Sequence, residues 1–83
     1  MEKTKENALE IYVDMMKKSW SYERLTENEK SRLLDAIRRT RLFGTFRQRW
    51  ETLQAVNFGF LLGVGYKPIG WRENENGKPI PLF

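Results

Sequence analysis

Two short patterns in this chain of 83 residues mark where helices begin. Thr26 stands three residues before Glu29, and Thr45 stands three residues before Gln48. In each pair the threonine hydroxyl can accept a hydrogen bond from the backbone N–H of the later residue, whose side chain can bond back to the threonine N–H. These two capping boxes predict one helix that begins near residue 27 and another that begins near residue 46.

The spacing of apolar residues predicts a further helix ahead of these two. Leu9, Val13 and Met16 fall on one helical face, and Thr4 is placed to cap its first turn. Gly44 is suited to end the second helix in a left-handed conformation. The connection between the first two helices carries no helical pattern of its own. The expected helices cover about 4–18, 27–41 and 46–64.

The C-terminal residues predict a tail rather than another helix. Asn76-Gly77 is a dipeptide typical of hairpin turns. Pro79 and Pro81 cannot donate to a strand ladder, so a hairpin here must be short. The expected fold class is therefore mainly α: a three-helix domain over 1–67, closed by an extended or short β-hairpin tail over 68–83 that packs on it.

The chain contains no cysteine and no histidine, so disulfides and the usual structural zinc sites are excluded. Three Trp, three Tyr and five Phe provide the large side chains from which a core of this size can be built. We interpret Trp20, Trp50 and Trp71 as anchors in the core or at its edge, because small domains seldom expose tryptophan. The alternative is that Trp71, beside Arg72, is presented to a protein partner.

The same composition argues against an enzyme. There is no thiol, no imidazole, no Gly-rich phosphate loop and no serine beside a recognisable base. The acidic side chains of the first expected helix alternate with lysines, which indicates a solvated face rather than a metal site. We therefore expect no cofactor, no metal and no small-molecule substrate.

The chain is expected to be a soluble cytoplasmic protein without a membrane partner. Its first residues, 1–6, contain no apolar signal segment. Its longest apolar run, 55–66, is interrupted by Asn57 and falls short of the roughly 20 residues that span a bilayer. The absence of cysteine fits a reducing compartment.

Positive charge is concentrated between Lys30 and Arg49. This segment holds seven basic side chains and one acidic side chain, Asp35, hence a net +6, whereas the whole chain carries +4. A basic zone of this kind on a small domain is typical of a nucleic-acid contact. Arg39 shares a helical strip with Asp35, which leaves the cations around the turn near Gly44 as the strongest candidates.

The two helices that flank this turn resemble a helix-turn-helix in outline. The outline departs from the motif in detail, because Thr40 stands four residues before Gly44 where a small residue is customary. The later helix would read bases through Arg47, Gln48, Glu51 and Thr52. The free amides at its start and Thr45 could hold a phosphate. The candidate nucleic-acid-binding residues are Arg38, Arg39, Arg41, Thr45, Arg47, Gln48 and Arg49.

Apolar surface supports a second hypothesis. The first expected helix is apolar over about half of its circumference, and residues 55–64 are apolar all round, more than one short chain needs for its own core. Gly59 and Gly63 would let another helix approach closely, and Asn57 is either a core amide bonded to the tail backbone or a polar residue that fixes the register of an oligomer. The candidate interface residues are Ile11, Met15, Asn57, Gly59, Gly63 and Trp71.

The sequence thus predicts a small, basic, non-enzymatic binding module. The first hypothesis is DNA or RNA binding through the basic helix-turn-helix region. The alternative is a protein–protein interaction or self-association module, such as a homodimer, in which the arginines form a solvated surface.

Overall fold

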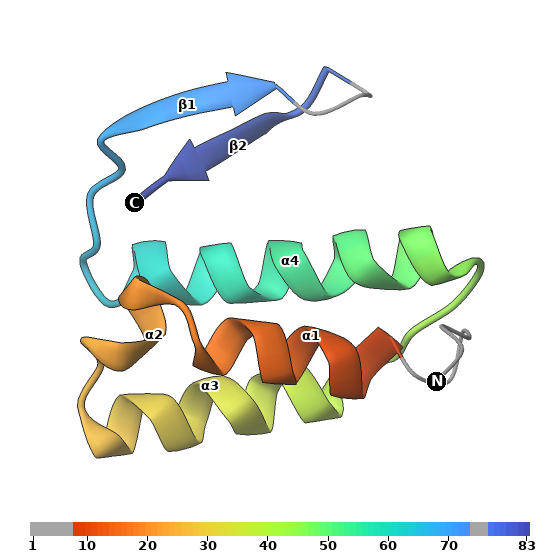
Figure 1. The fold of residues 1–83 in the computed structure, drawn as a ribbon, viewed down its shortest axis with the longest axis horizontal. Coiled ribbons are helices and arrows are strands. Elements are labelled where there is room, and N and C mark those ends of the chain that lie inside the picture. Colours follow the sequence, from red (N-terminus) through yellow and green to blue (C-terminus); the bar gives the residue numbers. More distant parts are fainter. Residues whose placement is uncertain (1–7, 74–76) are drawn as a thin grey trace.

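The computed structural model describes residues 8–73 and 77–83 and shows four helices followed by a two-stranded hairpin within these ranges (Figure 1). The mainly α fold with a hairpin tail is confirmed. The central helix, α4, lies between the hairpin on one side and the other helices on the opposite side. The elements are α1 (Ala8–Lys17), α2 (Trp20–Glu23), α3 (Glu27–Arg39), α4 (Phe46–Gly63), β1 (Gly70–Glu73) and β2 (Pro79–Leu82).

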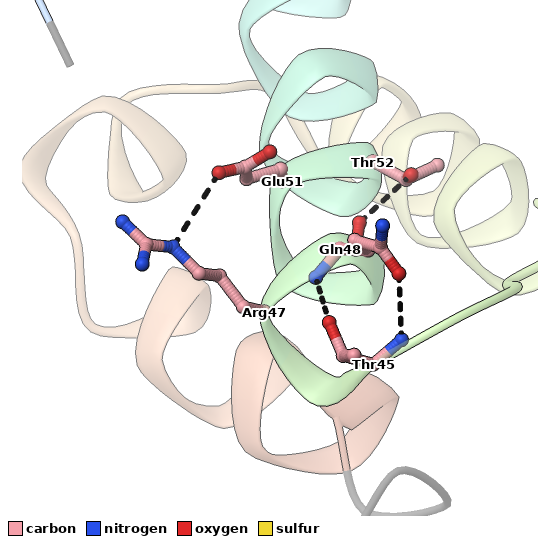
Figure 2. A network of polar contacts seen from close by, with 5 residues as sticks. All are labelled: Thr45, Arg47, Gln48, Glu51 and Thr52. Carbon is pink, nitrogen blue, oxygen red and sulfur yellow. Dashed lines mark hydrogen bonds and ion pairs between the residues drawn. The ribbon is translucent and has the colours of Figure 1, made fainter. Parts of the chain in front are cut away.

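Both predicted capping boxes are formed. The Thr26 hydroxyl accepts from the Glu29 N–H at 3.1 Å, and the Glu29 carboxylate accepts from the Thr26 N–H at 2.9 Å. Thr45 and Gln48 make the same pair of bonds at 3.2 and 2.8 Å, as Figure 2 shows. Helices α3 and α4 therefore begin where these local patterns place them.

The connection between α1 and α3 is more regular than expected, because it contains the short helix α2. Ser19 caps this turn by accepting from the Tyr22 N–H at 3.3 Å and donates its hydroxyl to the Met16 carbonyl at 2.6 Å. Helix α1 ends at Lys17, one residue earlier than expected. Its predicted start, with Thr4 as N-cap, lies outside the described residues.

Helix α3 ends at Arg39 rather than at Arg41. Thr40 leaves the helix in an extended conformation and donates its hydroxyl to the Ala36 carbonyl at 2.8 Å. The expectation that Gly44 ends this helix is therefore wrong. Gly44 does adopt a left-handed conformation, with φ 87°, but it lies in the loop directly before the Thr45 cap of α4.

The core lies where α1, α3 and α4 meet. Each of these helices contributes fully buried side chains, and α4 packs against both of the others. At the far end of α4, the Tyr66 hydroxyl donates to the Ser21 carbonyl at 2.9 Å and ties the end of the helix to α2. The largest fully buried side chains are Tyr12, Met16, Leu33, Ile37, Leu53 and Leu61.

The hairpin is short, as the prolines predict. Pro79 and Pro81 have no N–H, so only the other two residues of β2, which pair with Gly70 and Arg72, can donate to β1. Gly77 has φ 76°, whereas the preceding Asn76 lies outside the described residues. The ring of Phe83 attaches the hairpin to the helices through contacts with two aromatic rings, described below.

No helix in the described ranges is both long enough and apolar enough to cross a membrane.

Candidate nucleic-acid interface

The predicted arginines around the α3–α4 loop occupy different environments. Arg38 and Arg41 are exposed, the first in the last turn of α3 and the second in the loop. Arg39 is exposed but forms an ion pair with Asp35 at 3.3 Å. Arg49 donates from Nε to the Gly44 carbonyl at 3.2 Å and so braces the loop. Arg38, at the end of α3, and Arg41, in the loop, are therefore exposed to solvent.

Thr45 and Gln48 have a structural role at the start of α4. The Thr45 hydroxyl and the Gln48 amide oxygen are both engaged in the capping box, which also satisfies the N–H groups of these two residues (Figure 2). Thr52 donates to the Gln48 carbonyl at 3.0 Å. The box uses the N–H groups of Thr45 and Gln48, but the Thr45 hydroxyl only accepts in it and keeps a proton that it can donate. The phosphate-binding role of Thr45 therefore stays a prediction.

A cleft of about 500 Å³ lies between α4, from Phe46 to Phe58, and the hairpin. We refer to it as the α4–hairpin cleft. Three cations line it: Arg47 from α4, and Arg72 and Lys78 from the hairpin. Glu51 lies in the same cleft and pairs with Arg47 at 3.7 Å, as Figure 2 shows. Among the described residues of the lining, cations therefore outnumber carboxylates.

Aromatic rings form the helical wall of this cleft. The rings of Phe46 and Trp50 are stacked, with centroids 5.8 Å apart and planes 25° from parallel. Trp50 is fixed from behind by Tyr12, whose ring meets it edge-on at 4.8 Å. Phe58 continues the wall, and the centroid of its ring lies 6.0 Å from that of Phe83. The wall is therefore held by the core and offers apolar, π-rich surface next to cations.

Sequence reasoning missed two cations and one aromatic residue of this region. Arg72 and Lys78 lie far from the basic segment in sequence and reach Arg47 only because the hairpin folds back over α4. Phe43, in the loop two residues after Arg41, is 72% exposed. Its place directly before Gly44 and close to Arg41 is the one sequence signal that could have marked it, since exposed aromatics among cations are typical of surfaces that stack bases.

Asn57 does not lie at the surface, although we expected it in an interface. It is buried, and its amide donates to the Tyr12 hydroxyl at 3.1 Å. It is therefore a satisfied core amide, but its partner is a side chain of α1 rather than the tail backbone. Burial raises the pKa of Tyr12 from 10.0 to about 12, and the hydrogen bond from Asn57 partly opposes this rise.

The other candidate interface residues do reach the surface. Gly59 and Gly63 face open space, with no atom placed where a side chain would extend. Ile11 is half-buried, and Met15 and Trp71 are exposed, Trp71 by 57%. These residues do not form one patch with Asn57, because the amide points inward to α1.

The tryptophans only partly match the expected core positions. Trp50 is half-buried at the edge of the core, as predicted. Trp20 and Trp71 are each 57% exposed, so the core interpretation is wrong for both. The Trp20 ring instead lies under the Arg24 guanidinium, 4.7 Å from the ring centroid, an arrangement that stabilises an aromatic ring at the surface.

Comparisons with protein-family models, with curated proteins and with solved structures gave no match. In the described part of the chain, no group of three or more acidic residues is placed to hold a metal ion. The function of the chain is therefore inferred from the chemistry of the loop and the α4–hairpin cleft.

Proposed function

We propose that this chain is a small non-enzymatic nucleic-acid-binding module that uses the α3–α4 loop and the α4–hairpin cleft. The observation that carries the proposal is that the hairpin brings Arg72 and Lys78 to the same cleft as Arg47 of α4. Two further arginines, Arg38 at the end of α3 and Arg41 in the following loop, are exposed.

Positive charges that come together from distant segments are explained better by binding of a polyanion than by solvation of a helix face. A solvated face usually pairs its cations with neighbouring carboxylates, as Arg39 does with Asp35. In the cleft, by contrast, Arg72 and Lys78 come to the Arg47–Glu51 pair from a segment that is distant in sequence. The exposed Phe43 adds a surface on which a base can stack.

The test is a binding titration with labelled single-stranded RNA and with duplex DNA at several salt concentrations. Each phosphate contact releases counterions, so affinity should fall steeply with salt. The plot of log affinity against log salt concentration has a negative slope. The double substitution Arg38→Gln with Arg41→Gln should reduce the magnitude of this slope by about two units. Absence of binding to either probe at low salt would refute the proposal.

A matched control variant has the same net charge as the arginine variant. Lys17 and Lys18 lie at the opposite end of α1, away from the α3–α4 loop (Figure 1). Replacing both by Gln removes two positive charges, as the arginine variant does, but it leaves the proposed interface intact. If both variants lowered the slope equally, the interaction would depend on net charge and not on this surface.

A second candidate function is self-association or capture of a protein partner. The observation that favours it is the exposed apolar surface of the hairpin region, where Ile69 is 85% exposed and Trp71 and Leu82 are also exposed. Sedimentation over a range of concentrations tests self-association. A rise in mean mass that Trp71→Ser abolishes would support this function, and a constant mass of one chain would count against self-association.

A further inference from the structure

We infer that the α4–hairpin cleft accepts an unpaired base of a single-stranded nucleic acid, with the flanking phosphates held by Arg47, Arg72 and Lys78. This inference rests on the proposed nucleic-acid function and names the class of ligand that the site would take. It differs from the helix-turn-helix outline of the sequence, in which α4 enters the major groove of a duplex.

The position of the hairpin argues against duplex reading by α4. A major groove admits a single helix or a two-stranded ribbon. Here α1 and α3 pack on one side of α4, and the hairpin lies over the other side (Figure 1). Arg47 and Glu51, two of the four residues expected to read base edges in the duplex mode, line the cleft beneath the hairpin instead. The helix therefore has no bare face on this side to insert into a groove.

The size and walls of the cleft suit one planar base. A volume of about 500 Å³ falls within the range of sites that hold small organic groups. The stacked rings of Phe46 and Trp50 provide an aromatic wall, and stacking on such rings is how proteins hold unpaired bases irrespective of sequence. Bases inside a duplex are already stacked and paired, so only an unpaired base can reach this wall.

The polar groups of the cleft favour a nucleic acid over an acidic peptide. Both ligands carry negative charge that the three cations would attract. Glu51, however, lies inside the cleft, where it repels carboxylates and phosphates alike but can accept a hydrogen bond from the N–H of a base, which an acidic side chain does not offer. Gln54 lines the same space and provides both a donor and an acceptor for a base edge.

The decisive variant fills the cleft without removing a charge. Ala55 is exposed on α4 and lines the cleft, so Ala55→Tyr places a ring in the proposed base site. Thr52→Tyr is the matched control, because Thr52 is exposed on the same helix but does not line the cleft. Circular dichroism of both variants confirms that the helices persist before binding is measured.

The affinity of the full chain is measured for three probes of equal length. They are a single-stranded oligonucleotide, an abasic strand with the same number of phosphates, and a duplex. We expect the single strand to bind about tenfold or more tightly than the abasic strand, the difference that stacking of one base provides. Ala55→Tyr should abolish this preference and leave the weak, salt-dependent binding of the abasic strand unchanged. Thr52→Tyr should retain the preference.

Failure of this inference is distinct from failure of the proposed function. Equal, salt-dependent binding of all three probes would overturn the base site but leave a nucleic-acid-binding surface in place. No binding of any probe at low salt would overturn both. An acidic peptide that binds in a manner sensitive to Ala55→Tyr, while the single strand and the abasic strand bind equally, would assign the cleft to a peptide and overturn the inference.

Discussion

Raising the pH should reveal how much the buried hydroxyl of Tyr12 contributes to stability. The ring is buried in the core, and burial raises its pKa from 10.0 to about 12 in the folded chain. Between these two values the folded state keeps the phenol proton and the unfolded state loses it. The folded state therefore binds more protons, and the free energy of unfolding falls as the pH rises through this window. Its contribution is fully present below about pH 10.

The magnitude follows from the size of the shift. Two pKa units at about 1.4 kcal/mol each correspond to about 3 kcal/mol, lost once the pH has passed both values. The substitution Tyr12→Phe isolates this contribution, because the two proteins differ only in this hydroxyl.

The assay is urea denaturation followed by circular dichroism from about pH 8 to pH 12. At pH 8 we expect Tyr12→Phe to be less stable by about 1–3 kcal/mol, because it leaves the buried Asn57 amide without its acceptor. This difference should shrink above about pH 10, by about 2 kcal/mol at pH 12, so a difference that begins below this value reverses in sign there. A difference that stays constant across the whole range would refute the burial of this hydroxyl and the pKa argument built on it.

Two glycines and the last residue give further predictions. Gly44→Ala should destabilise the fold by about 1–2 kcal/mol in urea, because Gly44 has φ 87° and the added carbon would collide with the Gln48 amide that caps α4. Gly59→Ala, at an exposed helical position with open space, should instead be neutral or stabilise by up to about 1 kcal/mol. Phe83→Ala should speed amide hydrogen exchange in β1 and β2 and leave that of α3 and α4 unchanged.

The helix starts could be predicted because their causes are local. A threonine and a polar residue three positions later satisfy each other whatever the rest of the chain does, so Thr26 and Thr45 mark α3 and α4 without knowledge of the fold. Helix α2 carries only four residues, too few for an apolar period, and only its Ser19 cap marks it. The end of α3 depends on a hydroxyl of Thr40 that bonds back to Ala36, a choice that the glycine four residues later does not control.

The candidate site was harder to predict because a charge acts through space and not along the chain. The basic segment ends at Arg49, and the remainder of the chain has a net charge of −2, so nothing in the sequence groups Arg72 and Lys78 with the basic segment. A polyanion is attracted by cations within a screening length of about 8 Å at physiological salt, however distant these cations are from one another in sequence. The hairpin brings these two cations to the cleft of Arg47, and a two-stranded hairpin with prolines has little stability of its own.

What fixes the hairpin over α4 is therefore part of the site. Phe83 contacts Phe58 on α4 at 6.0 Å and Tyr66, just after this helix, at the same distance. The cations of the hairpin and those of α4 share a cleft only while this aromatic cluster holds. Binding through the cleft should consequently respond to Phe83 even though this ring does not line it, whereas the charge pattern of the α3–α4 loop, with Arg38 and Arg41, is independent of the hairpin.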